Sequence, residues 1–310
     1  MIWAATRCEN SRQVTPSLSP YPFSRRFVLR LLPALAFGAP SFVLSETDPS
    51  LQAKLASIEK GIGGRLGVAA LDTATGRRLG YRDTELFAMC STFKLLLAGC
   101  ILQGVDAGSL GLNNLISYGE KDLLEYAPVT RAHVGQGAMT VGDMCAAAVE
   151  LSDNTAANLL LAQVGGPAGL TQFVRLLGNP VTRLDRTEPD LNSALPGDPR
   201  DTTSPAAMVD SMEKLLTGNA LSARSRAQLA SWLVQSTTGK NRLRAGMPAD
   251  WRAGDKTGTG ERGAVGDIGI FWPPAKAPIL IAAYVMEGSA PRDQREEALA
   301  AVGRLIAQVL

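Results

Sequence analysis

The chain has 310 residues, of which 45% are hydrophobic and 19% are charged, and its formal net charge is +2. A chain of this length and balance suits one globular unit or two closely joined lobes. The sequence shows no repeat of fixed period, and its nearly neutral charge gives no electrostatic footprint for nucleic acid. A small-molecule enzyme or a binding domain remains.

The N-terminal stretch has the pattern of a targeting signal rather than of a folded element. The segment SRRFVLRLLPALAFGAPSFVLS places Arg25 and Arg26 before a modest apolar run with small residues near its end. This pattern predicts a twin-arginine export signal over residues 1–45 that is removed. A retained membrane anchor is the alternative, but Arg30 and Pro33 interrupt the run, which is shorter than the roughly 20 apolar residues that span a bilayer. We therefore expect a periplasmic or secreted protein without a stable membrane anchor.

The rest of the chain falls into three stretches by its hydrophobic pattern. Residues 51–64 have helical apolar spacing ended by glycines, and residues 65–82 favour two strands about a Thr-Gly turn. From residue 87 to residue 235 the pattern is almost wholly helical, apart from a Pro-rich and Asp-rich loop at 183–201. The end returns to strands and closes with a helix.

This order predicts an α+β fold with two lobes. Residues 46–86 and 236–310 are expected to form an α/β lobe, in which one antiparallel sheet is flanked by helices. Residues 87–235 are expected to form an all-α lobe that is inserted in the sequence and includes the loop 186–201. A cleft at the seam between the two lobes is the natural place for an active site.

Histidine and cysteine usage limits the chemistry. Because His133 is the only histidine, a serine nucleophile has one candidate imidazole, and zinc sites built on several histidines are excluded. The four cysteines, Cys8, Cys90, Cys100 and Cys145, show no CxxC spacing, so neither a zinc knuckle nor a redox motif is indicated. We expect neither a metal nor another cofactor.

Three short motifs fall near the expected seam. They are STFK at residues 91–94, SDN at residues 152–154 and KTGTG at residues 256–260. STFK opens the first helix of the inserted lobe, SDN lies between two helical stretches, and KTGTG is expected to begin a strand. Each motif is weak alone, since SxxK arises by chance about once in a few hundred residues, but the three in this order are a strong signal.

In these motifs the chain resembles the class A serine β-lactamases, from about residue 51 to its end. A fourth stretch, RTEPDLNSALPGDPRDTTSP, is similar to the family's Ω loop, with its glutamate and asparagine at Glu188 and Asn192. The resemblance implies hydrolysis of the β-lactam amide of penicillins and cephalosporins through an acyl-enzyme, and hence antibiotic resistance. It implies a monomer whose partners are small β-lactam molecules, without nucleic acid.

The resemblance, with the spacing of the motifs, suggests five catalytic residues. Ser91 is expected to be the nucleophile and to share one helix face with Lys94, which the apolar sequence around it buries. Either Lys94 or Glu188, acting through a water, takes the Ser91 proton. Ser152 is expected to pass a proton to the departing nitrogen, helped by Lys256, and Glu188 to activate the water that splits the ester.

Substrate binding is expected from residues beside these five. Asn154 would hold the side-chain amide of the substrate, and Asn192 would share the hydrolytic water. The resemblance implies that the strand after KTG runs along the edge of the nucleophile, which makes Gly258 and Thr259 substrate-binding residues. The backbone N–H groups of Ser91 and Thr259 would then form the oxyanion hole.

The substrate carboxylate needs cationic and hydroxyl donors, which Thr257 and Lys256 supply in part. Many relatives add an arginine from the next strand, but Val265 stands at the matching position here. Arg242, where some relatives carry an alternative arginine, is expected to complete the anchor; the competing interpretation is an exposed helix arginine. Tyr126 resembles the aromatic wall of the entrance, with plain packing as its alternative.

Structural roles are expected for three residues at the site. Asp153 would bond to backbone and fix its neighbours, and an ion pair between Arg186 and Asp201 would close the Ω loop.

The resemblance also bears on the thiols, because the positions whose cysteines pair with Cys145 or Cys90 in some relatives hold no cysteine here. We therefore predict free thiols.

Other functions share part of this pattern. A D-alanyl-D-alanine carboxypeptidase or penicillin-binding protein has SxxK, an SDN-like triplet and KTG but stops at the penicilloyl state, and Glu188 with Asn192 argues against it. A β-lactam-sensing module would need a further membrane span or output domain. A catalytically silent relative would lack a motif position, and none is lost here.

Overall fold

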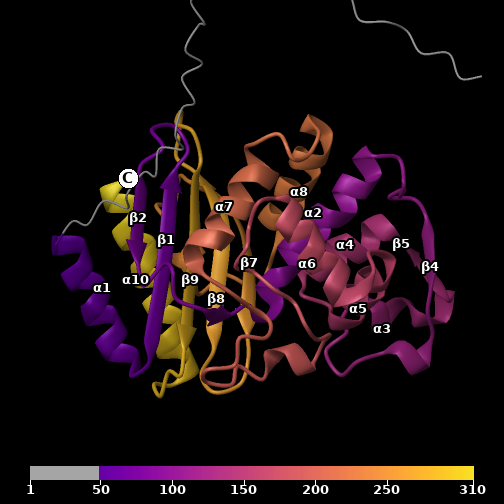
Figure 1. Cartoon of the computed structure of the whole chain (residues 1–310), viewed down its shortest axis with the longest axis horizontal. Coiled ribbons are helices and arrows are strands. Elements are labelled where there is room, and N and C mark those ends of the chain that lie inside the picture. The colour runs from indigo at the N-terminus through magenta and orange to yellow at the C-terminus, as the bar shows by residue number, and fades with distance from the viewer. Residues whose placement is uncertain (1–48) are drawn as a thin grey trace, which may run out of the picture. The chain divides into compact units, whose positions relative to one another are not determined.

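A five-stranded antiparallel sheet runs through the computed structural model, which describes residues 49–310 (Figure 1). In the order in which they lie side by side, the strands are β2 (Arg78–Tyr81), β1 (Arg65–Asp72), β9 (Ile279–Met286), β8 (Val265–Trp272) and β7 (Arg252–Thr259). Strands from the two ends of the chain therefore pair, as predicted, with Val68 opposite Ala283. The export signal predicted for residues 1–45 and Cys8 lie outside the described residues.

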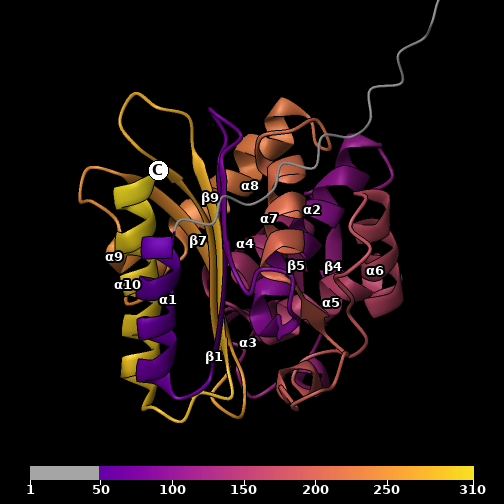
Figure 2. The same ribbon diagram turned by 60° about the vertical axis from the view of Figure 1, so that its left-hand side comes forward.

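Helices cover both faces of this sheet (Figure 2). One face carries α1 (Pro49–Ile62), α9 (Leu243–Gly246) and α10 (Arg292–Val309), and the other carries the inserted segment. All eight residues of β9 are buried, as an apolar strand covered on both faces requires. Leu51 and Leu55 of α1 pack with Leu299 of α10 in the core on the first face, because their spacing places them on one side of each helix.

The inserted segment is mainly helical. Its helices are α2 (Phe93–Asp106), α3 (Thr130–His133), α4 (Val141–Glu150), α5 (Asn154–Gln163), α6 (Gly166–Leu176), α7 (Pro205–Leu216) and α8 (Ala223–Gln235). The prediction that it is all-α was wrong in detail, because it also contains two short antiparallel ladders. They pair β3 (Phe87–Ala88) with β6 (Thr202–Thr203) and β4 (Leu115–Ser117) with β5 (Ala138–Thr140). Strands of two or three residues carry too short an alternation to be read from sequence.

The KTGTG motif ends a strand rather than begins one, which corrects the prediction. Lys256 lies in the middle of β7, and the strand continues to Thr259. β7 is the edge strand of the sheet, and its end packs against the 3₁₀ turn η1 (Cys90–Thr92) at the start of α2. The motif was misplaced because the strand begins with Arg252, in a polar stretch without apolar alternation.

The thiols of Cys90, Cys100 and Cys145 are free in the part of the chain that the structure describes, as expected. Burial raises the pKa of Cys90 to about 12 and that of Cys100 to about 11, so neither thiol is readily ionised near neutral pH. None of the helices in residues 49–310 has the length and apolarity needed to cross a membrane.

Candidate active site

Ser91 lies on a tight turn that leads into a buried helix. The turn is η1, and α2 follows it directly, with Lys94 in its first turn and fully buried. Cys90 has a positive φ of 45°, a conformation that non-glycine residues adopt mainly where the surrounding structure enforces it. The two residues expected on one helix therefore lie on a 3₁₀ turn and on the α-helix that follows, and they meet through a third residue.

That third residue is Glu188. Its Oε1 accepts a hydrogen bond from Oγ of Ser91 at 3.0 Å and lies 2.9 Å from Nζ of Lys94. Both side chains of the ion pair are fully buried. One carboxylate oxygen thus connects the candidate nucleophile to the buried ammonium.

Nζ of Lys94 has three further acceptors. They are Oδ1 of Asn154 at 2.6 Å, the carbonyl oxygen of Ser152 at 2.8 Å and Oγ of Ser152 at 3.3 Å. Burial lowers the pKa of Lys94, while the charge of Glu188 opposes that shift. The lysine is therefore both partnered and poised to give up a proton more easily than an exposed lysine.

Hydrogen bonds hold the backbone N–H, the backbone carbonyl oxygen and the second carboxylate oxygen of Glu188. Asn158 accepts a hydrogen bond from the Glu188 N–H at 3.0 Å and donates one to its carbonyl oxygen at 2.9 Å. Nδ2 of Asn192 donates to Oε2 of Glu188 at 2.5 Å. The peptide bond between Glu188 and Pro189 is cis. The carboxylate is thereby held in one orientation beside Ser91.

Ser152 stands at the break between α4 and α5, with a positive φ of 61°. Its Oγ accepts hydrogen bonds from Nζ of Lys256 at 3.0 Å and from Nζ of Lys94 at 3.3 Å. Burial lowers the pKa of Lys256 well below its ordinary value, and the nearby charge of Lys94 adds to that shift. A hydroxyl that accepts from two ammonium groups has its own proton free to donate into the cleft.

The end of β7 lies directly against the turn that carries Ser91. A Cβ on Gly258 would come within 2.6 Å of the Met89 carbonyl oxygen, so only glycine allows this approach. Thr257 and Thr259 both line the cleft, and Oγ1 of Thr257 lies 2.7 Å from Oγ1 of Thr238.

Arg242 is buried with 1% of its surface exposed, which excludes the interpretation as an exposed helix arginine. Its Nη1 donates to the carbonyl oxygens of Gly258 at 2.7 Å and Gly266 at 2.8 Å. Its Nη2 donates to Oγ1 of Thr259 at 2.7 Å and to Oε1 of Glu296 at 3.0 Å. All four Nη hydrogens are thus used within the protein, and Nε is buried without a partner in the described chain.

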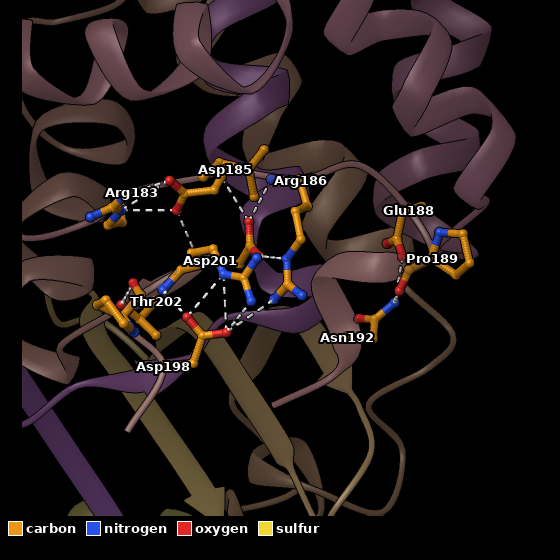
Figure 3. Close-up of polar contacts among 12 residues, drawn as sticks. Arg183, Asp185, Arg186, Glu188, Pro189, Asn192, Asp198, Asp201 and Thr202 are labelled. Atoms are coloured by element: carbon orange, nitrogen blue, oxygen red, sulfur yellow. Dashed lines mark hydrogen bonds and ion pairs between the residues drawn. The ribbon is translucent and has the colours of Figure 1, made fainter. Parts of the chain in front are cut away.

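The neck of the Ω loop is closed by polar contacts around Asp201 (Figure 3). Oδ2 of Asp201 accepts from Nε of Arg186 at 2.6 Å, and Oδ1 accepts from the backbone N–H groups of Asp185 at 2.7 Å and Arg186 at 2.9 Å. Asp201 is fully buried. Glu188 and Asn192 lie farther along the loop, away from this closure, as Figure 3 shows.

Two more expected residues have clear positions. Asp153 caps α5 by accepting from the Ala156 N–H at 2.9 Å, and it also accepts from the Val129 and Thr130 N–H groups at 2.9 Å. Tyr126 is 52% exposed, and its hydroxyl donates to the Leu151 carbonyl oxygen at 3.2 Å. Asp153 thus ties the SDN turn to the preceding loop, and Tyr126 leaves its ring at the cleft surface.

Several of these residues line a cavity of about 310 Å³. Its lining consists of Ser91, Tyr126, Ser152, Asn154, Asn192, Thr238, Arg242, Thr257, Thr259 and Arg292. Four residues that line or support the cavity were not predicted from the sequence, namely Thr238, Arg292, Glu296 and Asn158. Only Asn158 has a local signal, since it lies one helical turn after Asn154; the others reach the site through long-range folding.

The arrangement can support acyl transfer to a serine hydroxyl. It combines a hydroxyl bonded to a carboxylate–ammonium pair, a second hydroxyl between two lysines, and backbone N–H groups at the end of an edge strand. The sequence model of the β-lactamase enzyme family matches residues 50–310.

Relatives of known class match over nearly the whole chain. The chain is 42% identical to β-lactamase Toho-1 of Escherichia coli, over 91% of this chain and 97% of that one. It is 47% identical to β-lactamase L2 of Stenotrophomonas maltophilia, over 88% of this chain and 91% of that one. Among solved structures, an ancestral class A β-lactamase is 57% identical with a TM-score of 0.83, covering 84% of this chain and all of that one.

The chain therefore belongs to the β-lactamase enzyme family, and within it to class A. It is a hydrolase that acts on β-lactams through an acyl-enzyme on a serine, the mechanism general to this family.

Proposed function

We propose that Ser91 is the serine that is acylated and that the Glu188–Lys94 pair accepts its proton. The observation that carries this proposal is the position of Glu188 Oε1, which is bonded to both Ser91 Oγ and Lys94 Nζ. The backbone N–H groups of Ser91 and Thr259 then stabilise the developing oxyanion. Ser152 donates its free proton to the departing nitrogen and regains one from Lys94, which passes on the proton taken from Ser91. The Lys256 ammonium stabilises the negative charge that develops on Ser152 Oγ during this transfer.

The second half of the reaction is assigned to the same carboxylate. With Asn192 fixing its other oxygen, Glu188 activates the water that hydrolyses the ester. Asn154 holds the side-chain amide of a penicillin or cephalosporin, and Tyr126 forms the wall of the entrance. The site lies between residues 87–235 and the sheet with its flanking helices, which supports the two-lobed division.

Peptide mapping by mass spectrometry tests the nucleophile. A slowly hydrolysed β-lactam should add its full mass to the peptide that contains Ser91, and Ser91→Ala should lose both this adduct and turnover. Ser193→Ala, on the Ω loop and outside the cleft lining, is the control and should keep both. An adduct on another residue would contradict the assignment.

Arg242 is proposed to act on the substrate carboxylate through Thr259 rather than by direct contact. The Nη hydrogens of Arg242 are all used within the protein, and one of them is donated to the Thr259 hydroxyl. Thr259 is exposed, so the proton of its hydroxyl can be donated to a substrate in the cleft. Thr259→Val should therefore raise KM about tenfold with a smaller change in kcat. Thr259→Ser retains the hydroxyl and should stay near the parent value.

A double-mutant cycle distinguishes an effect of Arg242 through Thr259 from a direct contact between Arg242 and the substrate carboxylate. Arg242→Met should raise KM in the parent but add little in the Thr259→Val background. Equal and additive increases in KM would mean that Arg242 contacts the carboxylate itself. Melting temperatures must be measured alongside, because Arg242 also bridges β7 and β8.

We also propose that the enzyme works as a monomer in the periplasm or after secretion, following removal of the predicted signal. The twin-arginine pattern at Arg25 and Arg26 supports this location. The intact mass of the chain isolated from the periplasmic fraction measures whether the signal has been removed.

A further inference from the structure

A positively charged corner lies at one end of the cleft, where Arg242 reaches the start of α10. Arg242, Arg292 and Arg295 interact there with one carboxylate, that of Glu296. Oε1 of Glu296 accepts from Nη2 of Arg242 at 3.0 Å and from Nε of Arg292 at 3.0 Å. Arg242 and Arg292 share this one carboxylate, and Arg295 adds a third positive charge nearby, so positive charge is in excess around Glu296.

The ionisation of the neighbouring groups is consistent with this excess. Burial alone would raise the pKa of Glu296, but hydrogen bonds from Arg242 and Arg292 outweigh it and hold the pKa below its usual value. Burial, followed by the charges of Arg292 and Arg242, lowers the pKa of Arg295. Glu296 is therefore ionised, and one carboxylate does not neutralise the cations around it.

Arg292 differs from Arg242 in having free donors. Its side chain is 64% exposed, and it lines the same cavity as Ser91. Only its Nε is bonded; its two Nη groups make no hydrogen bond within residues 49–310. A guanidinium group held at one nitrogen and open at the other two is arranged to receive a carboxylate or sulfonate in a two-point contact.

We propose that Arg292 forms a subsite for a second anionic group of the β-lactam, separate from the ring carboxylate. This inference rests on the proposed function, in which Thr259 binds the ring carboxylate. In a cephalosporin the C3 substituent is the neighbour of that carboxylate, so an acidic group carried at C3 is the group that reaches Arg292. The enzyme thereby favours cephalosporins with a negatively charged C3 substituent over neutral isosteres.

Steady-state kinetics on a matched pair of cephalosporins test the subsite. The two share one acyl side chain and carry at C3 either a carboxylate or the isosteric carboxamide. Arg292→Gln should lower kcat/KM for the carboxylate by about three- to tenfold, mainly through KM, because the ion pair is partly exposed. The carboxamide should change by less than about twofold, and high salt should reduce the parent's preference.

Two control variants test whether the preference depends on the charge and the position of Arg292. Arg292→Lys keeps the charge and should retain part of the preference, and Arg262→Gln removes an arginine of similar environment that does not line the cleft. If Arg262→Gln abolishes the preference equally, or Arg292→Gln slows both substrates alike or neither, the subsite is refuted. A parent enzyme that hydrolyses neither cephalosporin contradicts the proposed function, whereas a parent that hydrolyses both at equal kcat/KM contradicts the subsite alone.

Discussion

Replacing Glu188 with Gln should convert the enzyme into a stable acyl-enzyme. In the proposed mechanism Glu188 is the base that activates the water that splits the ester, so the variant lacks this base. Lys94 remains to accept the Ser91 proton, so acylation can still proceed. Turnover of a good penicillin should fall by about 10²- to 10⁴-fold, the usual size of a general-base contribution. Intact-protein mass spectrometry should show the penicilloyl adduct persisting on the variant and absent from the parent after the same time.

Asp190→Asn is the matched control for this experiment, since it removes an exposed carboxylate two residues away on the same loop. It should hydrolyse penicillin at nearly the parent rate. Near-parent turnover by Glu188→Gln, with no adduct, would show that another group activates the water. A circular-dichroism spectrum checks the fold, because the substitution also removes the partner of the buried Lys94 charge.

Asp201→Asn should loosen the Ω loop and destabilise the protein. Asp201 is fully buried and accepts from two backbone N–H groups and from the guanidinium group of Arg186. An asparagine removes the nearest counter-charge of Arg186, leaving Asp198 at 4.0 Å from its Nη2, and turns one buried acceptor into a donor. We therefore expect a loss of about 3–5 kcal/mol. For a chain of this size, that corresponds to a fall in Tm of about 6–20 °C.

Asp198→Asn provides the comparison, because Asp198 lies in the same loop but pairs mainly with Arg200, whose side chain is 47% exposed. Its contact with Arg186 is longer, at 4.0 Å. This substitution should cost about 1 kcal/mol or less. Calorimetry on both variants, with activity measured below the transition, distinguishes the two sites. Equal melting temperatures for Asp201→Asn and the parent would show that the ion pair does not close the loop.

Much of this fold could be read from the sequence because its signals are local. The helical spacing of Leu51 and Leu55 and the continuous apolar run of β9 depend only on near neighbours in the chain. The β4–β5 and β3–β6 ladders escaped prediction because such short strands are stabilised by their tertiary partners. The same holds for KTGTG, whose position at the end of β7 follows from pairing with β8.

By itself, the sequence determined which chemical groups the site contains. The motif spacing and the family resemblance named Ser91, Lys94 and Glu188, since covalent catalysis restricts the residue types that can serve. The tertiary structure decided how these groups meet, because hydrogen bonds form between residues far apart in the chain. It brought one oxygen of Glu188 to both Ser91 and Lys94, used every Nη hydrogen of Arg242 inside the protein, and left those of Arg292 open to the cleft.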